Sequence, residues 1–239
     1  MRRFYSVLIC CALCAALLCG CGGGSTGSGG AGIRRREYSS EELQFTAPAQ
    51  GAPVAVFDTS AGEIRAVLYP DKAPQACENF IALAQRGYYD GTVFYRVESG
   101  FCIEGGLDGA GGSTTAWGGS GYPAETTDAL HHYSGALCAA MNTNGEGGSV
   151  FYILQTLPEA PAADLLAQME SAGCRQAVID AYKAVGGAPY LDYTDTVFGQ
   201  VYSGMDVVDA IAQAETDEAM APLEPIVVNR VTITTYGEG

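Results

Sequence analysis

Apolar and polar residues alternate along several short stretches of the chain, which is typical of β-strands with one buried face. Residues 54–57 and 63–69 show this pattern, and Thr59-Ser60-Ala61-Gly62 between them favours a hairpin turn. The pattern predicts further strands at residues 93–97, 101–104, 136–141, 150–155, 196–201 and 226–234. The region is therefore rich in short strands joined by turns.

Two other segments repeat apolar residues every three or four positions, as in a helix with one buried face. Residues 75–86 follow Pro74, which suits a first helical turn, and they stop before Gly87. Residues 205–214 form the second segment. Many short strands with two principal helices predict a closed antiparallel β-barrel covered at its ends by those helices.

The first residues have the composition of a targeting segment. Two arginines precede an uncharged apolar run over residues 4–18, which is shorter than the roughly 20 residues of a membrane-spanning helix. The run ends in Leu18-Cys19-Gly20-Cys21, which resembles a bacterial lipobox. That resemblance implies a signal peptide over residues 1–20, with Cys21 as the lipidated first residue of the mature protein. The alternative is an ordinary signal peptide with incidental cysteines.

Composition then divides the rest of the chain. Residues 22–32 are almost entirely glycine and serine, so we expect residues 21–52 to be a lipidated cysteine and a flexible linker. Residues 53–236 are long enough for one domain with a substantial core, and residues 237–239 form a short tail. We expect this domain to be monomeric and held at the extracytoplasmic face of the cell membrane by its lipid.

The net charge of the chain limits the kinds of partner that we expect it to bind. With 12 basic and 27 acidic residues, the net charge is −15, which argues against binding nucleic acid. An acidic surface favours basic polypeptides as partners.

The cysteine pattern argues against metal or redox chemistry. Five of the nine cysteines lie at or before Cys21, and the other four are widely spaced with no C-x-x-C motif: Cys77, Cys102, Cys138 and Cys174. We expect them to be small buried apolar residues. His131-His132 has no spaced companion ligand, so we expect neither a metal nor a cofactor.

Residues 94–106, FYRVESGFCIEGG, carry the most specific signal in the chain. They resemble the cyclophilin signature F-H-R-V-x-x-G-F-x-x-Q-G-G. GEIRAVLYPDKAPQACENFIAL, before this motif, and TVFGQVYSGMDVVDAI, from Thr196, also resemble cyclophilin segments in the same order. The resemblance implies the cyclophilin barrel and peptidyl-prolyl cis-trans isomerase activity on proline-containing polypeptides. Such a reaction only rotates an amide bond, so it needs no nucleophile, metal or cofactor.

The resemblance also implies roles for individual residues. Arg96 falls at the catalytic arginine, whose guanidinium stabilises the twisted prolyl amide more than either planar form. An apolar slot for the proline ring falls at Phe101, Cys102, Tyr152 and Leu191. The alternative is that these four residues are ordinary core.

Four further positions complete the implied substrate site. Ala140 and Met141 align with a pair whose main chain holds the peptide, so side-chain changes there are tolerated. Tyr190 and Asp195 stand at the rim, where the family has Trp and His. These rim substitutions predict an altered ligand preference.

Other departures from the family pattern bear on catalysis. Tyr95 replaces His, Val150 replaces Gln, and Glu104 replaces the Gln that orients the catalytic arginine. A carboxylate orients Arg96 through a stronger bond, but it also neutralises part of its charge, so we expect reduced activity. The alternative function is a non-catalytic proline-peptide binding module or chaperone on a cyclophilin scaffold.

Residues 157–189 occupy a place where short cyclophilins have only a loop. Their pattern predicts helices at residues 162–172 and 174–185, each stopped by glycine. Two interpretations are open: a lip that selects clients beside the proline pocket, or a surface elaboration packed on the barrel.

Overall fold

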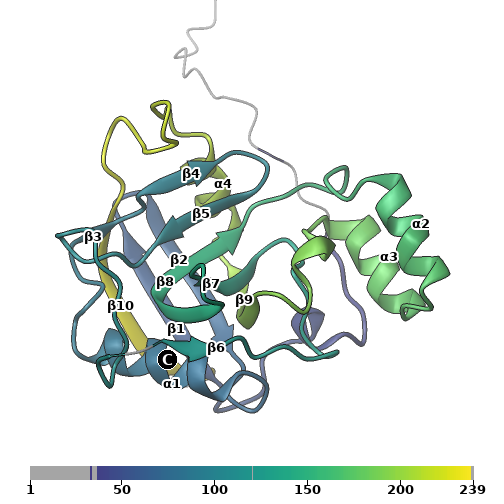
Figure 1. Ribbon diagram of the computed structural model, residues 1–239, viewed down its shortest axis with the longest axis horizontal. Coiled ribbons are helices and arrows are strands. Elements are labelled where there is room, and N and C mark those ends of the chain that lie inside the picture. Colours follow the sequence, from purple (N-terminus) through teal and green to yellow (C-terminus); the bar gives the residue numbers. More distant parts are fainter. Residues whose placement is uncertain (1–32, 34–36, 120, 238–239) are drawn as a thin grey trace, which may run out of the picture. The chain divides into compact units, whose positions relative to one another are not determined.

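The computed structural model describes residues 33, 37–119 and 121–237 (Figure 1). The predicted signal peptide, Cys21 and the glycine-rich part of the predicted linker lie outside these residues. Within the described ranges, every helix is too short or too polar to cross a membrane.

The strands of the described chain form one antiparallel sheet. Its strands are β1 Pro53–Thr59, β2 Gly62–Leu68, β3 Thr92–Val93, β4 Arg96–Glu98, β5 Cys102–Gly105, β6 Tyr122–Pro123, β7 Ala136–Met141, β8 Glu146–Leu154, β9 Thr196–Ser203 and β10 Val227–Thr235. The order across the sheet is β3-β10-β1-β2-β9-β7-β8-β5-β4, and β6 pairs separately with β8. The predicted strands are thus confirmed, except that residues 93–97 contain two short strands where one was expected.

The prediction of a closed barrel is not supported as stated. Among the described residues, no strand pairing joins β3 to β4, the two ends of the order, so the sheet is a curled half-barrel (Figure 1). The reason lies in the two residues between those strands. Phe94 N–H donates to the carbonyl of Ile226, on the side of β10, whereas Tyr95 N–H donates to the carbonyl of Glu104 in β5. The chain itself therefore crosses from one edge of the sheet to the other.

Aromatic rings fill the concave side of the sheet. Phe80, from helix α1 (Pro74–Gln85), lies with its ring centroid 5.8 Å from Phe57, 5.8 Å from Phe151 and 5.3 Å from Phe198. Helix α1 packs against β8, β9 and β10, while helix α4 (Met205–Ala212) packs against β2, β4 and β5. The two predicted helices therefore cover the two ends of the half-barrel (Figure 1).

Residues 157–189 contain two helices, α2 (Ala163–Ser171) and α3 (Gln176–Val185), close to the predicted bounds. Their inward residues form a separate apolar cluster with Tyr133 of the loop before β7. The ring of Tyr182 lies 4.6 Å from that of Tyr133, and both side chains are fully buried. These contacts support a segment packed on the loop before β7; that it is an insertion relative to short cyclophilins stays a prediction.

The predicted flexible linker is wrong for residues 37–52, because this part of the chain is packed against the domain. Gln44 is only 6% exposed, and its amide accepts from His131 N–H (2.7 Å) and donates to the His131 carbonyl (2.9 Å). Phe45 packs 4.9 Å from the rings of Tyr38 and Tyr133. Polar composition suggested a linker, but the Gln44 amide satisfies backbone groups that would otherwise be buried without partners.

Candidate active site

The hairpin of β4 and β5 positions Arg96 through strand register. Arg96 lies directly opposite Glu104, and Glu98 lies opposite Cys102. Alternate residues of a strand share a face, so these four side chains project from one side of the hairpin. Val97 and Ile103 project from the other side into the aromatic core. The convex side of the half-barrel therefore carries the motif residues.

Two carboxylates hold the Arg96 guanidinium. Its Nη1 donates to Glu104 Oε2 at 3.0 Å, and its Nη2 donates to Glu98 Oε2. Burial acts to lower the pKa of Arg96, but the hydrogen bond to Glu104 and the nearby negative charges outweigh burial and raise that pKa above its usual value. Arg96 is thus a permanent cation in a fixed orientation, with part of its charge neutralised. Sequence reasoning missed Glu98, although its spacing of two from Arg96 in a strand was the available signal.

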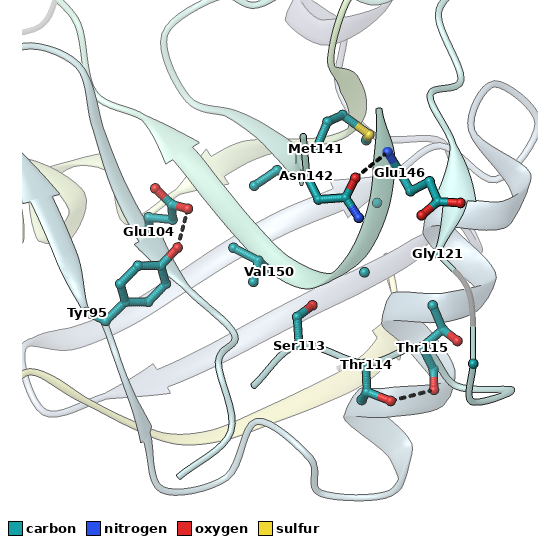
Figure 2. A pocket seen from close by; sticks show the side chains of 14 residues that line it. Tyr95, Glu104, Ser113, Thr114, Thr115, Gly121, Met141, Asn142, Glu146 and Val150 are labelled. Atoms are coloured by element: carbon teal, nitrogen blue, oxygen red, sulfur yellow. Dashed lines mark hydrogen bonds between the residues drawn. The ribbon is translucent and has the colours of Figure 1, made fainter. Parts of the chain in front are cut away.

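Tyr95 fixes the carboxylate that holds Arg96. Its phenolic O–H donates to Glu104 Oε1, as Figure 2 shows, while Glu104 Oε2 faces Arg96. Burial and the hydrogen bond to Glu104 raise the pKa of Tyr95, so the phenol keeps its proton and remains a donor. The sequence showed only that Tyr95 replaces the family's His; its link to Glu104 emerges from the structure.

An apolar surface lies directly beside the guanidinium. The Phe101 ring centroid is 5.6 Å from Arg96 Cζ, and Cys102 Sγ is 3.4 Å from Arg96 Nη1. Cys102 and Tyr152 belong to one buried cluster, with Phe101, Ala140 and Leu191 packed at its edge. Burial raises the pKa of the Cys102 thiol to about 12, so it acts here as a small neutral group. The structure therefore brings the predicted proline-slot residues together.

The predicted rim residues also lie near this surface. Tyr152 O–H donates to Asp195 Oδ2 at 2.9 Å. Tyr190 is 59% exposed, and partial burial together with the neighbouring Glu98 and Cys102 raises its pKa. Tyr190 thus stands beside the carboxylate of Glu98 with most of its ring open to solvent.

A cavity of about 390 Å³ adjoins the Arg96 hairpin on the side of Glu104 (Figure 2). It is lined by Tyr95, Glu104, Ser113, Thr114, Thr115, Gly119, Gly121, Ala140, Met141, Asn142, Glu146, Gly147, Gly148 and Val150. The predicted main-chain binding pair, Ala140 and Met141, therefore faces this cavity. Sequence reasoning missed its far wall, which is formed by Ser113, Thr114, Thr115, Gly119 and Gly121, because a glycine-rich loop carries no periodic signal.

Of the four cysteines expected to be buried, Cys77, Cys102 and Cys138 are buried, but Cys174 is exposed. In the ranges that the structure describes, no group of three or more His, Cys, Asp and Glu is arranged to hold a metal ion.

Comparisons with known proteins identify the family. The sequence model of the cyclophilin-type peptidyl-prolyl cis-trans isomerase family matches residues 54–233. A Staphylococcus aureus protein named "Putative peptidyl-prolyl cis-trans isomerase" is 35% identical over 77% of this chain and 93% of its own length. A Staphylococcus epidermidis protein of the same name is 33% identical over 74% of this chain and 90% of its own. This chain belongs to the cyclophilin-type peptidyl-prolyl cis-trans isomerases.

Solved structures agree on the fold. A cyclophilin-type isomerase from Cryptosporidium parvum, determined in the presence of the dipeptide Ala-Pro, matches with a TM-score of 0.60 at 22% identity. The match covers 76% of this chain and 98% of that one. Another structure of the same Cryptosporidium protein matches with a TM-score of 0.60 at 21% identity. The cyclophilin fold and the isomerase family predicted from residues 94–106 are therefore confirmed.

Proposed function

We propose that Arg96 is the catalytic residue of this isomerase and that it acts on Xaa-Pro bonds bound over Phe101 and Cys102. One observation carries this assignment: a guanidinium held by two carboxylates lies within contact distance of an apolar surface of the right kind for a proline ring. The related Cryptosporidium structure, determined with Ala-Pro, supports a proline-containing ligand.

The chemistry follows from the electronic structure of the prolyl amide. Rotation removes the partial double bond, at a barrier of roughly 18–20 kcal/mol without a catalyst. The nitrogen becomes pyramidal and gains a lone pair, which the Arg96 N–H groups can approach as donors. Because this lone pair exists only in the twisted amide, Arg96 stabilises that state more than either planar state.

The protein has surfaces that match the rest of the substrate. The proline ring packs on Phe101, Cys102 and Leu191, and the main chain of Ala140 and Met141 holds the peptide backbone. Tyr190 and Asp195 border the slot, where they act on the residues next to proline.

A binding module without catalysis is the alternative, and one observation favours it. Arg96 faces both Glu98 and Glu104, so its charge is shared between two bound carboxylates. A protease-coupled isomerisation assay on a panel of neutral Xaa-Pro peptides separates the two functions. Turnover above the uncatalysed rate supports the enzyme, whereas peptide binding without turnover supports the module.

Glu104→Gln should raise kcat/KM for a short neutral peptide by a few fold. An amide oxygen still accepts from Arg96 but no longer neutralises its charge, and a bond to a neutral acceptor is roughly half as strong. The same assay measures the change. The matched control is Glu63→Gln, which removes the carboxylate paired with Arg65 on β2. It should leave kcat/KM unchanged. A fall in activity for Glu104→Gln would show that orientation by the carboxylate outweighs its neutralising effect.

The cellular setting of the enzyme is a proposal from the first residues alone. We place the domain at the extracytoplasmic face of the cell membrane as a monomer, attached through lipidated Cys21 and acting on exported polypeptides. The apolar run over residues 4–18 and the motif Leu18-Cys19-Gly20-Cys21 support this placement.

Cys21→Ser should abolish fatty-acid labelling and release the protein from membranes, because a lipobox needs the thiol of that cysteine. Metabolic labelling and membrane fractionation measure both effects. Cys19→Ser is the matched control and should keep label and membrane association. Unchanged labelling of Cys21→Ser would remove the lipoprotein assignment while leaving the isomerase intact.

A further inference from the structure

We infer that Asp192 is a positioning residue for the proline side of the active site, because its buried carboxylate locks the segment that carries Tyr190 and Leu191. The inference rests on the function proposed above and adds a role for the helical segment of residues 157–189. Asp192 itself does not touch the substrate; it acts through the two residues before it.

Four hydrogen bonds converge on this carboxylate. His131 Nδ1–H donates to Oδ2 at 2.8 Å, and Tyr182 O–H donates to the same oxygen at 2.8 Å. His132 donates to Oδ1 twice, from its ring Nδ1 at 2.9 Å and from its backbone N–H at 2.9 Å. The Asp192 side chain is only 8% exposed, so these bonds are shielded from water. Charge-assisted bonds in such surroundings hold a group firmly in one place.

Asp192 directly follows Tyr190 and Leu191, two residues of the proposed active site. Pro189–Leu191 form a single 3-10 turn, closed by bonds from Leu191 N–H to the Ala188 carbonyl (2.9 Å) and from Asp192 N–H to the Pro189 carbonyl (3.2 Å). Leu191 packs against the cluster that contains Cys102 and Tyr152. A shift of Asp192 would therefore move Leu191 relative to the proline slot.

The backbone after Asp192 shows that this segment is held in place from outside. Tyr193 has a φ of 68°, in the left-handed region that a bulky residue rarely adopts. Its hydroxyl donates to Asp128 Oδ1 at 2.9 Å. A conformation of this kind persists only where surrounding contacts impose it, and the bond to Asp128 and the four bonds to Asp192 are among those contacts.

The carboxylate keeps its charge over the physiological pH range. Burial alone would raise the pKa of Asp192, but the bonds from His131 and His132 outweigh it and lower that pKa to about 2. Other ionisable groups in the surroundings are Tyr133, Cys138, Tyr193 and Asp195. A buried charge that loses its donors is strongly unfavourable, so the donors and Asp192 stay together.

The donors link distant parts of the chain to the site. Tyr182 belongs to α3, so this helix contacts Asp192 through the Tyr182 hydroxyl group. The loop of His131 is fixed in turn by Gln44 from the N-terminal segment. Residues 157–189 thus support the proline slot from behind, which differs from a lip that covers it.

The test is the separate measurement of KM and kcat for Asp192→Asn on a neutral Xaa-Pro peptide. We expect KM to rise about tenfold, the size of effect expected when charged hydrogen bonds are lost, with kcat unchanged because Arg96 is untouched. A merely structural role predicts the reverse: partial unfolding lowers the active fraction and therefore kcat, and leaves KM as it was. Unchanged KM in folded Asp192→Asn overturns the inference.

Two further variants keep the result decisive. Glu42→Gln weakens the pair between Glu42 and Arg175, which also ties α3 to the N-terminal segment but does not touch Asp192, and should leave KM unchanged. Tyr182→Phe removes one of the four bonds and keeps the ring, so KM should rise about two- to threefold. If Asp192→Asn does not fold, the KM of Tyr182→Phe decides, and an unchanged value overturns the inference.

Failure of the proposed function can be distinguished from failure of the inference about Asp192. An inactive parent protein overturns catalysis, whereas the dissociation constant of the same peptide still reports the effect of Asp192. Weaker peptide binding by Asp192→Asn than by Glu42→Gln then supports the positioning role, and equal binding overturns it.

Discussion

Arg96→Ala should lower kcat/KM for a short Xaa-Pro peptide by about 100- to 1000-fold, the usual effect of removing one donor that acts on the transition state. The loss should fall on kcat, because the guanidinium interacts mainly with the twisted amide and the proline slot stays intact. The fold should be preserved, since the Arg96 side chain is partly exposed at the surface of the hairpin. The protease-coupled assay measures the rate, and circular dichroism checks the fold.

A matched control separates the role of this arginine from that of any arginine in an ion pair. Arg65→Ala removes a guanidinium that is paired with Glu63 on β2, and it should leave kcat/KM unchanged. One outcome would reverse the functional assignment. If the parent protein and Arg96→Ala both give the uncatalysed rate while peptide still binds, the chain is a proline-peptide binding module.

The part of the site that could be predicted from sequence consists of residues that lie close together along the chain. Arg96, Phe101 and Glu104 lie within nine residues, and the register of one hairpin places Arg96 and Glu104 on the same face. The same holds for most of the fold, because each strand and each helix has its own periodic pattern. The closed barrel was predicted from the many short strands and two helices, and the two-residue crossing between β3 and β4 carries no pattern that would have corrected it.

What could not be predicted depends on contacts between distant segments. Asp192 meets His131 and His132 across about 60 positions of the chain, and Gln44 meets His131 across 87. In the sequence, Gln44 is one polar residue in a polar stretch, and the two histidines have no spaced partner. Their environment is set by how the helical segment packs, so a single sequence gives no signal for them.

The same charged groups determine both the position of Arg96 and the strength of its catalytic effect. Arg96 is held by Glu98 and Glu104, and Glu104 is held in turn by Tyr95. Each additional acceptor fixes the guanidinium more firmly and also neutralises more of its charge. The apolar surface of Phe101 lowers the local polarity and strengthens the remaining field. Catalysis therefore depends on the apolar slot as well as on the cation.

Phe101→Ala should weaken binding of a proline peptide by about 30- to 1000-fold, which corresponds to about 2–4 kcal/mol for removing a well-packed aromatic ring. The ring packs at the edge of the cluster with Cys102, and it also faces the Arg96 guanidinium at 5.6 Å. Both the apolar floor and a cation–π contact that orients Arg96 are lost. Because Phe101 is only partly buried, we expect the lower half of this range, and isothermal titration with a neutral Xaa-Pro peptide measures it.

The loss of the ring also affects folding, so binding must be compared between folded variants. Tyr202→Ala is the control: it removes a partly exposed ring near the end of β9, where Tyr202 packs 5.7 Å from Tyr236. It should lose stability without changing the dissociation constant of the peptide. The loss of affinity in Phe101→Ala should persist at temperatures well below the unfolding midpoint of that variant, because it arises from missing contact area and not from a smaller folded fraction. A folded Phe101→Ala that binds peptide as tightly as the parent would place the proline slot elsewhere on the sheet.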